Sequence, residues 1–148
     1  MTAPAGPAKP VIVVGVVLVA VAAGAALAST SRYRGELDRN PMTRVTLRVD
    51  RDDGDRVVVG FKVKRLLISC DGAADARLGR AEIRGEATVA DRGRFELKGG
   101  DPILRMAVKG KLAGKRRAHG TVRYSGLTNV GGEELECASG KRAWSAKR

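Results

Sequence analysis

An unbroken apolar stretch near the amino terminus restricts most strongly how this chain can fold. Residues 11–28 read VIVVGVVLVAVAAGAALA, and Lys9 is the one charged residue before Ser29. A run of this length fits the hydrocarbon core of a bilayer better than the interior of so small a protein, where the alternative would be a buried helix. We therefore expect residues 1–31 to be a signal peptide or membrane anchor, with a hydrophobic helix.

Two fates are open for this segment. Ala26-Leu27-Ala28 before Ser29 has the small-x-small pattern of a signal-peptide cleavage site, whereas the length of the run also suits a retained anchor. Arginines at 32, 34, 39 and 44 follow it, and the positive-inside rule would keep them in the cytoplasm. The cysteines argue for export, so we expect a domain that is secreted or anchored facing outward, with residues 11–28 in the membrane.

The chain has two cysteines, Cys70 and Cys137. A single pair so far apart suits one disulfide in an oxidising compartment, the alternative being two unrelated buried thiols. With one histidine, His119, the chain lacks the four ligands of a Cys/His zinc site. We expect the disulfide and no metal ion.

From Tyr33 onward, apolar residues recur with a period of two, which indicates β-strands. Val45, Leu47 and Val49 form one apolar face, and Asp53-Gly54 supplies a hairpin turn. In the next stretch the apolar residues have odd numbers up to Val63 and even numbers from Leu66 onward. We therefore expect a β-bulge near Lys64-Arg65 that shifts the alternation by one residue. The positions expected to face the core are Val57, Val59, Phe61, Val63, Leu66, Ile68, Cys70, Ile83, Ala87, Val89, Phe95, Leu97, Leu104, Met106, Val108, Leu112, Val122, Tyr124, Trp144 and Ala146.

Short strands separated by glycine-rich turns predict an all-β domain over residues 33–148. An antiparallel meander that forms a small sandwich or a barrel-like domain fits this spacing, and glycines within the strands favour curvature. Four of the five aromatic residues share the parity of their aliphatic neighbours, and we expect all five in the core. Few rings are left to stack on bases, which makes a nucleic acid an unlikely partner.

The chain is strongly basic, with a net charge of +12. No Asp or Glu occurs between Pro102 and Gly132, where a hairpin around Gly114 would present cations on one surface and oppose like charges. We expect this surface, the basic face, to bind anions. It comprises Arg105, Lys109, Lys111, Lys115, Arg116, Arg117 and Arg123.

The sequence contains no recognisable catalytic set. His119 lies opposite the apolar parity and is expected to face solvent, and no nucleophile elbow or phosphate loop is present. The acidic string from Asp50 to Asp55 lacks the glycine position of an EF-hand and has Phe61 where that loop needs a glutamate, so a solvated hairpin is the simpler interpretation. We expect no enzymatic activity and no cofactor.

Several short elements together resemble an uncharacterised family of small exported β-rich proteins of high-GC bacteria. The elements are Tyr33-x-Gly35, Asp53-Gly54, Cys70-Asp71-Gly72, Ala118-x-Gly120-Thr121-Val122 and Cys137-x-Ser139-Gly140-x-x-x-Trp144-x-Ala146. The resemblance implies a β-rich fold, export and a paired cysteine, and it implies no activity.

Two functions remain open. One is a cell-envelope domain that binds anionic polymers or lipid headgroups through the basic face. The alternative is a carrier of small apolar ligands with a cavity inside a barrel. A filled interior would favour the first, and an empty lined cavity the second.

Overall fold

The computed structural model describes residues 29–100 and 103–148, which form eight strands and one short 3-10 helix. The expected apolar helix lies in residues 1–28, outside the described residues. Among the described residues, no helix is long and apolar enough to cross a membrane. The elements are β1 (Ser31–Leu37), β2 (Asn40–Asp52), β3 (Asp55–Cys70), β4 (Ala76–Thr88), η1 (Asp91–Gly93), β5 (Arg94–Gly100), β6 (Leu104–Ala113), β7 (Arg117–Val130) and β8 (Glu133–Lys147).

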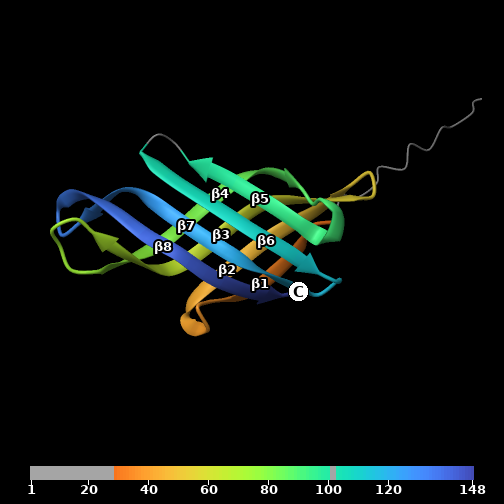
Figure 1. Cartoon of the computed structure of the whole chain (residues 1–148), viewed down its shortest axis with the longest axis horizontal. Helices are drawn as coiled ribbons and strands as arrows, with labels where there is room; N and C mark the ends of the chain where they lie inside the picture. The colour runs from red at the N-terminus through yellow and green to blue at the C-terminus, as the bar shows by residue number, and fades with distance from the viewer. Residues whose placement is uncertain (1–28, 101–102) are drawn as a thin grey trace, which may run out of the picture.

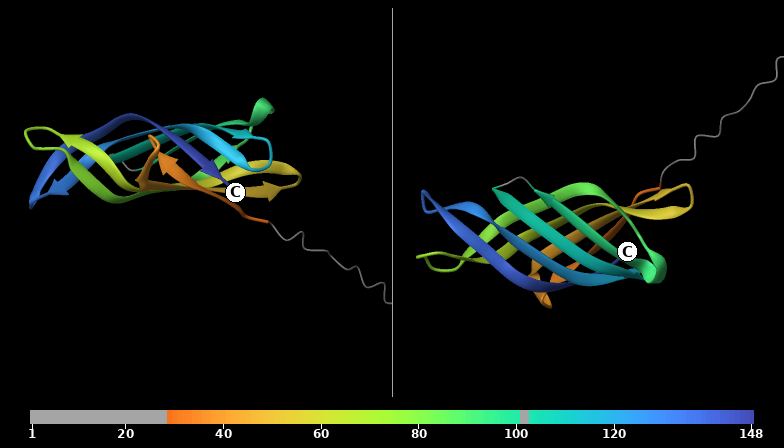
Figure 2. Two further views of the ribbon diagram at one scale, coloured as in Figure 1. Left: turned by 90° about the horizontal axis from the view of Figure 1, so that it is seen from below. Right: turned by 45° about the horizontal axis from the view of Figure 1, so that its top comes forward.

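The strands form one antiparallel sheet that curves into a flattened barrel (Figures 1 and 2). Their order is β4-β3-β2-β1-β8-β7-β6-β5, so the first and last strands are neighbours. The described residues of β4 and β5 meet at a seam without a backbone ladder, where a Cβ on Gly85 would lie 3.2 Å from Leu97 Cδ1. The predicted all-β meander is confirmed, with barrel-like closure.

The first predicted hairpin is confirmed in β2 and β3. Val45, Leu47 and Val49 are all buried. Asp53 and Gly54 have φ angles of 45° and 90° in the turn between the strands. Positive φ at both central residues matches the right-handed twist of the flanking strands, which explains why Asp-Gly occupies this position.

The parity expected at the start of β3 is wrong. Val58 is fully buried, whereas Val57 and Val59 are only half-buried. Val49 pairs with Val58 and Arg48 pairs with Gly60, which leaves an extra residue in β3 between them. This bulge moves the valine run by one position, and periodicity could not locate it because three valines are consecutive.

The second change of face is confirmed at Arg65, although it is not a bulge between β3 and β4. Val63 and Leu66 are both buried, and Arg65 between them has a φ of 59°. Val63 still pairs with Ala81 and Leu66 with Leu78, so the β3–β4 register is unchanged. Both strands change face together at this point.

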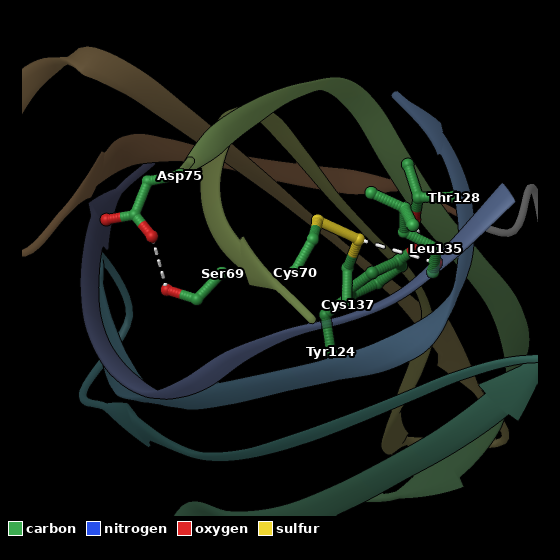
Figure 3. Close-up of a disulfide and its surroundings, with 7 residues drawn as sticks. All are labelled: Ser69, Cys70, Asp75, Tyr124, Thr128, Leu135 and Cys137. Carbon is green, nitrogen blue, oxygen red and sulfur yellow. Dashed lines mark hydrogen bonds between the residues drawn. A yellow bond between two sulfur atoms is a disulfide. The ribbon is translucent and has the colours of Figure 1, made fainter. Parts of the chain in front are cut away.

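The disulfide forms where β8 reaches β3. β1 pairs with β8 only from Arg34 to Leu37, and β8 continues past it to pair Cys137 with Cys70. The two sulfur atoms are 1.98 Å apart, and the two cysteines are separated by 67 residues in the sequence. Figure 3 shows the bond and its surroundings. The expected pairing of the cysteines is therefore confirmed in the structure, and it joins an early strand to the last one.

The barrel interior is filled by side chains. All five aromatic residues are buried, and Trp144 lies between Phe61 and Phe95 with ring centroids 5.3 and 6.3 Å apart. Gly110 leaves room for this group, because a Cβ there would lie 2.6 Å from Phe95 Cζ and 2.7 Å from Trp144 Cζ2. The close packing makes this cluster the centre of the core.

Candidate functional site: a basic face and a basic mouth

The basic face forms largely as the sequence predicts. All of its residues are exposed, as is His119. Three of its cations project from β6, two project from β7, and Lys115 and Arg116 lie in the turn between these strands. The side chains at 109, 111, 117 and 123 alternate with buried residues, which directs them to the outer wall of the barrel.

The register places repulsion at the borders of the hairpin rather than within it. Lys109 pairs with Thr121 and Lys111 with His119, so β6 and β7 do not oppose two formal cations. The neighbouring strands do oppose them, because the paired positions are Arg94 and Lys111, Arg117 and Lys147, and Arg123 and Lys141. The basic face thus extends beyond the predicted hairpin onto β5 and β8.

One carboxylate, Glu96 of β5, partly neutralises the basic face. Its Oε1 lies 3.0 Å from Lys98 Nζ and 3.7 Å from Lys109 Nζ. The hydrogen bond from Lys98 lowers the pKa of Glu96, and the charge of Lys109 acts in the same direction. Because these side chains are largely exposed, solvent and salt screen the pairs.

Two shallow grooves flank His119 on the outer wall. One, of about 690 Å³, is lined by residues that include Arg94, Lys109 and Lys111 of β5 and β6. The other, of about 490 Å³, is lined by residues that include Arg34, Arg117 and Lys147, together with Glu36. His119 lines both grooves, so they form a basic track across β5 to β8 and onto β1.

A separate pocket lies at one end of the barrel, which we call the mouth. This pocket has a volume of about 210 Å³, and its walls come from β1, β2, β3, the β6–β7 turn and the end of the sequence. Tyr33 and Val49, both buried, are part of its lining. Four basic side chains also line it: Arg51, Arg56, Lys115 and Arg148.

Hydrogen bonds to three backbone carbonyls hold the β6–β7 turn in place across the mouth. The Tyr33 hydroxyl donates to the Lys115 carbonyl at 3.3 Å, and Arg56 Nη1 donates to the Gly114 carbonyl at 3.3 Å. The Arg148 amide donates to the Arg116 carbonyl at 2.8 Å. Three contacts from distant parts of the chain therefore hold Lys115 over the pocket.

Elsewhere on the wall, one carboxylate is surrounded by guanidinium groups. Glu82 of β4 forms ion pairs with Arg80, Arg84 and Arg48, the last at 3.6 Å. Arg48 crosses Gly60 to reach it, because a Cβ on Gly60 would lie 2.6 Å from Arg48 Nη2. The hydrogen bond from Arg80 lowers the pKa of Glu82. Desolvation acts in the opposite direction, and the hydrogen bond from Arg84 lowers the pKa further.

Replacing Glu82 with glutamine should reduce the free energy of unfolding at neutral pH by about 0.5 kcal/mol, because its arginine partners are largely exposed. A lowered pKa stabilises the fold above the carboxyl's unfolded pKa, about 4.3, and this stabilisation is lost as pH falls through the folded pKa. Urea unfolding at several pH values should show the wild type and Glu82→Gln converging in acid. A difference that persists unchanged at low pH would contradict this origin.

Sequence reasoning located the hairpin cations but missed their neighbours. Arg34, Arg94, Lys141 and Lys147 follow the same outward parity, yet only the strand order brings them beside the hairpin. The mouth was missed because its residues are distant in sequence. No family model, curated protein or solved structure matches this chain, so the family resemblance stays a prediction.

Proposed function

We propose that this chain is an exported or membrane-anchored domain of the cell envelope that binds an acidic polymer through its basic face. The supporting observation is that β6 and β7 carry five outward cations and no acidic residue. The opposed cations at the borders with β5 and β8 repel one another, so a bound anion would relieve that repulsion. No catalytic step is part of this proposal.

The shape of the wall favours a polymer over a flat lipid surface. The outer wall of the barrel is convex (Figure 2), and the exposed cations and the two grooves lie on that wall. A plane would touch only part of such a surface, whereas a flexible polymer can follow it. Because the Debye length is about 8 Å at physiological salt, several adjacent charges are needed for appreciable binding.

The filled interior argues against the alternative of an apolar-ligand carrier. Such carriers enclose a cavity of roughly 300–1,000 Å³ with apolar walls. Here Trp144, Phe61 and Tyr124 occupy the barrel centre and are almost inaccessible to solvent. The grooves described above lie outside this core.

The proposal predicts salt-dependent binding to polygalacturonate, a polymer of carboxylates. Lys109→Ser, Lys111→Ser, Arg116→Ser and Arg117→Ser together should weaken binding by at least about tenfold, because each removed charge deletes a contact to the polymer. Binding of the full chain in nonionic detergent can be measured by fluorescence anisotropy of labelled polymer at several salt concentrations.

A matched variant distinguishes the effect of the basic face on binding from the effect of the net charge of the protein. Arg44→Ser, Lys62→Ser, Lys64→Ser and Arg77→Ser remove the same charge from β2, β3 and β4. This control should bind nearly as the wild type does. Equal losses in both variants, or binding that ignores salt, would refute a specific basic face. Preference for anionic vesicles over the polymer would assign the face to lipid headgroups.

A further inference from the structure

We infer that the mouth pocket is a second binding site, which takes the phosphate ester of a small polyol, such as a glycerol phosphate group. This site goes beyond the basic face, with which it shares only Lys115. Its volume of about 210 Å³ is below the usual range for drug-sized ligands and suits a single headgroup-sized molecule.

The charges of the pocket point to an anionic ligand. Arg51, Arg56 and Lys115 line it, with Arg148 as a fourth basic side chain, and Asp50 is the one carboxylate side chain among its lining residues. Among the described residues, none of these four cations forms an ion pair. Guanidinium and ammonium groups without carboxylate partners are what proteins present to phosphate oxygens.

The pocket is organised before any ligand binds. Arg56 donates to the Gly114 carbonyl and Tyr33 to the Lys115 carbonyl, which fixes the turn that bears Lys115 against β1 and β3. Ser29 and Ser31 add hydroxyl groups to the lining. A rigid lining lowers the entropic cost of holding a small anion.

Asp50 indicates that the ligand also carries a hydrogen-bond donor. It lines the pocket, and its Oδ1 is shielded from solvent and has no hydrogen-bond partner among the described residues. A buried acceptor without a donor is costly, and a bare phosphate dianion would add repulsion. A hydroxyl beside the phosphate would donate to the part of the Asp50 carboxylate that faces the pocket and would offset this cost, so a polyol phosphate fits better than inorganic phosphate.

The same chemistry occurs in membrane headgroups and in soluble polyol phosphates. The apolar run of the sequence ends at Ala28, and Ser29 lines the mouth, so a retained anchor would place this pocket beside the membrane. The experiment therefore has a soluble arm and a vesicle arm. Binding in either arm supports the polyol phosphate chemistry, and the arm identifies the source.

The soluble arm titrates the full chain, in nonionic detergent, with glycerol 1-phosphate and with inorganic phosphate while amide chemical shifts are recorded. We expect shifts around Ser31 and Lys115, and tighter binding of glycerol 1-phosphate. Arg51→Gln with Lys115→Gln should weaken that binding by about tenfold or more. The matched variant Lys109→Gln with Lys111→Gln carries the same charge loss on the basic face and should bind normally.

A second variant tests the donor to Asp50. Asp50→Leu removes the carboxylate at similar volume, so inorganic phosphate should bind more tightly while the advantage of glycerol 1-phosphate disappears. The vesicle arm compares phosphatidylcholine vesicles with and without phosphatidylglycerol, using the same charge variants.

Two results would overturn the inference. The first is no shift near the mouth with either soluble ligand and no effect of Arg51→Gln with Lys115→Gln on vesicle binding. The second is an equal loss in the mouth variant and the basic-face variant. Because polygalacturonate binding is measured separately on the basic face, failure of the mouth site leaves the proposed function standing.

Discussion

Replacing Trp144 with alanine is expected to lower the free energy of unfolding by about 3–5 kcal/mol, a large part of the stability of a domain of this size. Trp144 is 2% exposed and contacts both Phe61 and Phe95. Removing the indole opens a cavity that these rings cannot fill, since they are held by separate strands. Urea unfolding followed by far-UV circular dichroism measures the loss.

Trp144→Phe is the matched control. The indole Nε1 is buried and has no hydrogen-bond partner among the described residues, so phenylalanine removes an unsatisfied donor while keeping a ring in place. We expect this variant to lose at most about 1.5 kcal/mol. If alanine were tolerated as well as phenylalanine, Trp144 would not be part of a close-packed core.

Removing the disulfide is the second large effect. Replacing Cys70 and Cys137 together with alanine should cost about 4 kcal/mol in the chain-entropy model, because the bridge closes a loop of 67 residues. The melting temperature should fall by roughly 15 °C. Thermal unfolding with and without reductant measures this, and reductant should destabilise only the wild type.

Peptide mapping provides the corresponding test on native material. Digestion without reductant should recover the Cys70 and Cys137 peptides joined. Recovery of both as free thiols under thiol-trapping conditions would remove the bridge from the native protein and weaken the expectation of export.

Local signals predicted much of the fold. Alternation identified β2, and Asp53-Gly54 marked the turn into β3, because a primed turn needs residues that adopt positive φ. The aromatic residues were placed correctly in the core, because large apolar side chains in a small domain have few other places to be buried.

The features that sequence reasoning missed depend on distant pairing. The start of β8 was not predicted, because Glu133, Glu134 and Glu136 hide the alternation there. Ser139 supplies another irregularity there: it lies at a bulge, and its hydroxyl accepts from the Tyr124 amide and donates to the Gly140 carbonyl. No local pattern shows a side chain replacing a backbone partner in this way.

The candidate sites also differ in whether local sequence signals or distant strand pairing determines them. The strand cations of the basic face could be assigned to a surface by parity, and Lys115 and Arg116 by the turn around Gly114. The mouth required the strand order, since Arg51, Lys115 and Arg148 approach one another only when β1 lies between β2 and β8. A net charge gives the amount of basic surface, and topology decides where it is concentrated.

Pairing of β1 with β8 also sets the order of events during synthesis. Among the described strands, β1 is synthesised first, and its partner residues 144–147 are synthesised last, together with the tryptophan that fills the core. Contacts of such long sequence separation slow folding, and the nascent chain must keep the unpaired edge of β1 accessible until the final strand appears. The barrel is therefore expected to close only once β8 has been synthesised.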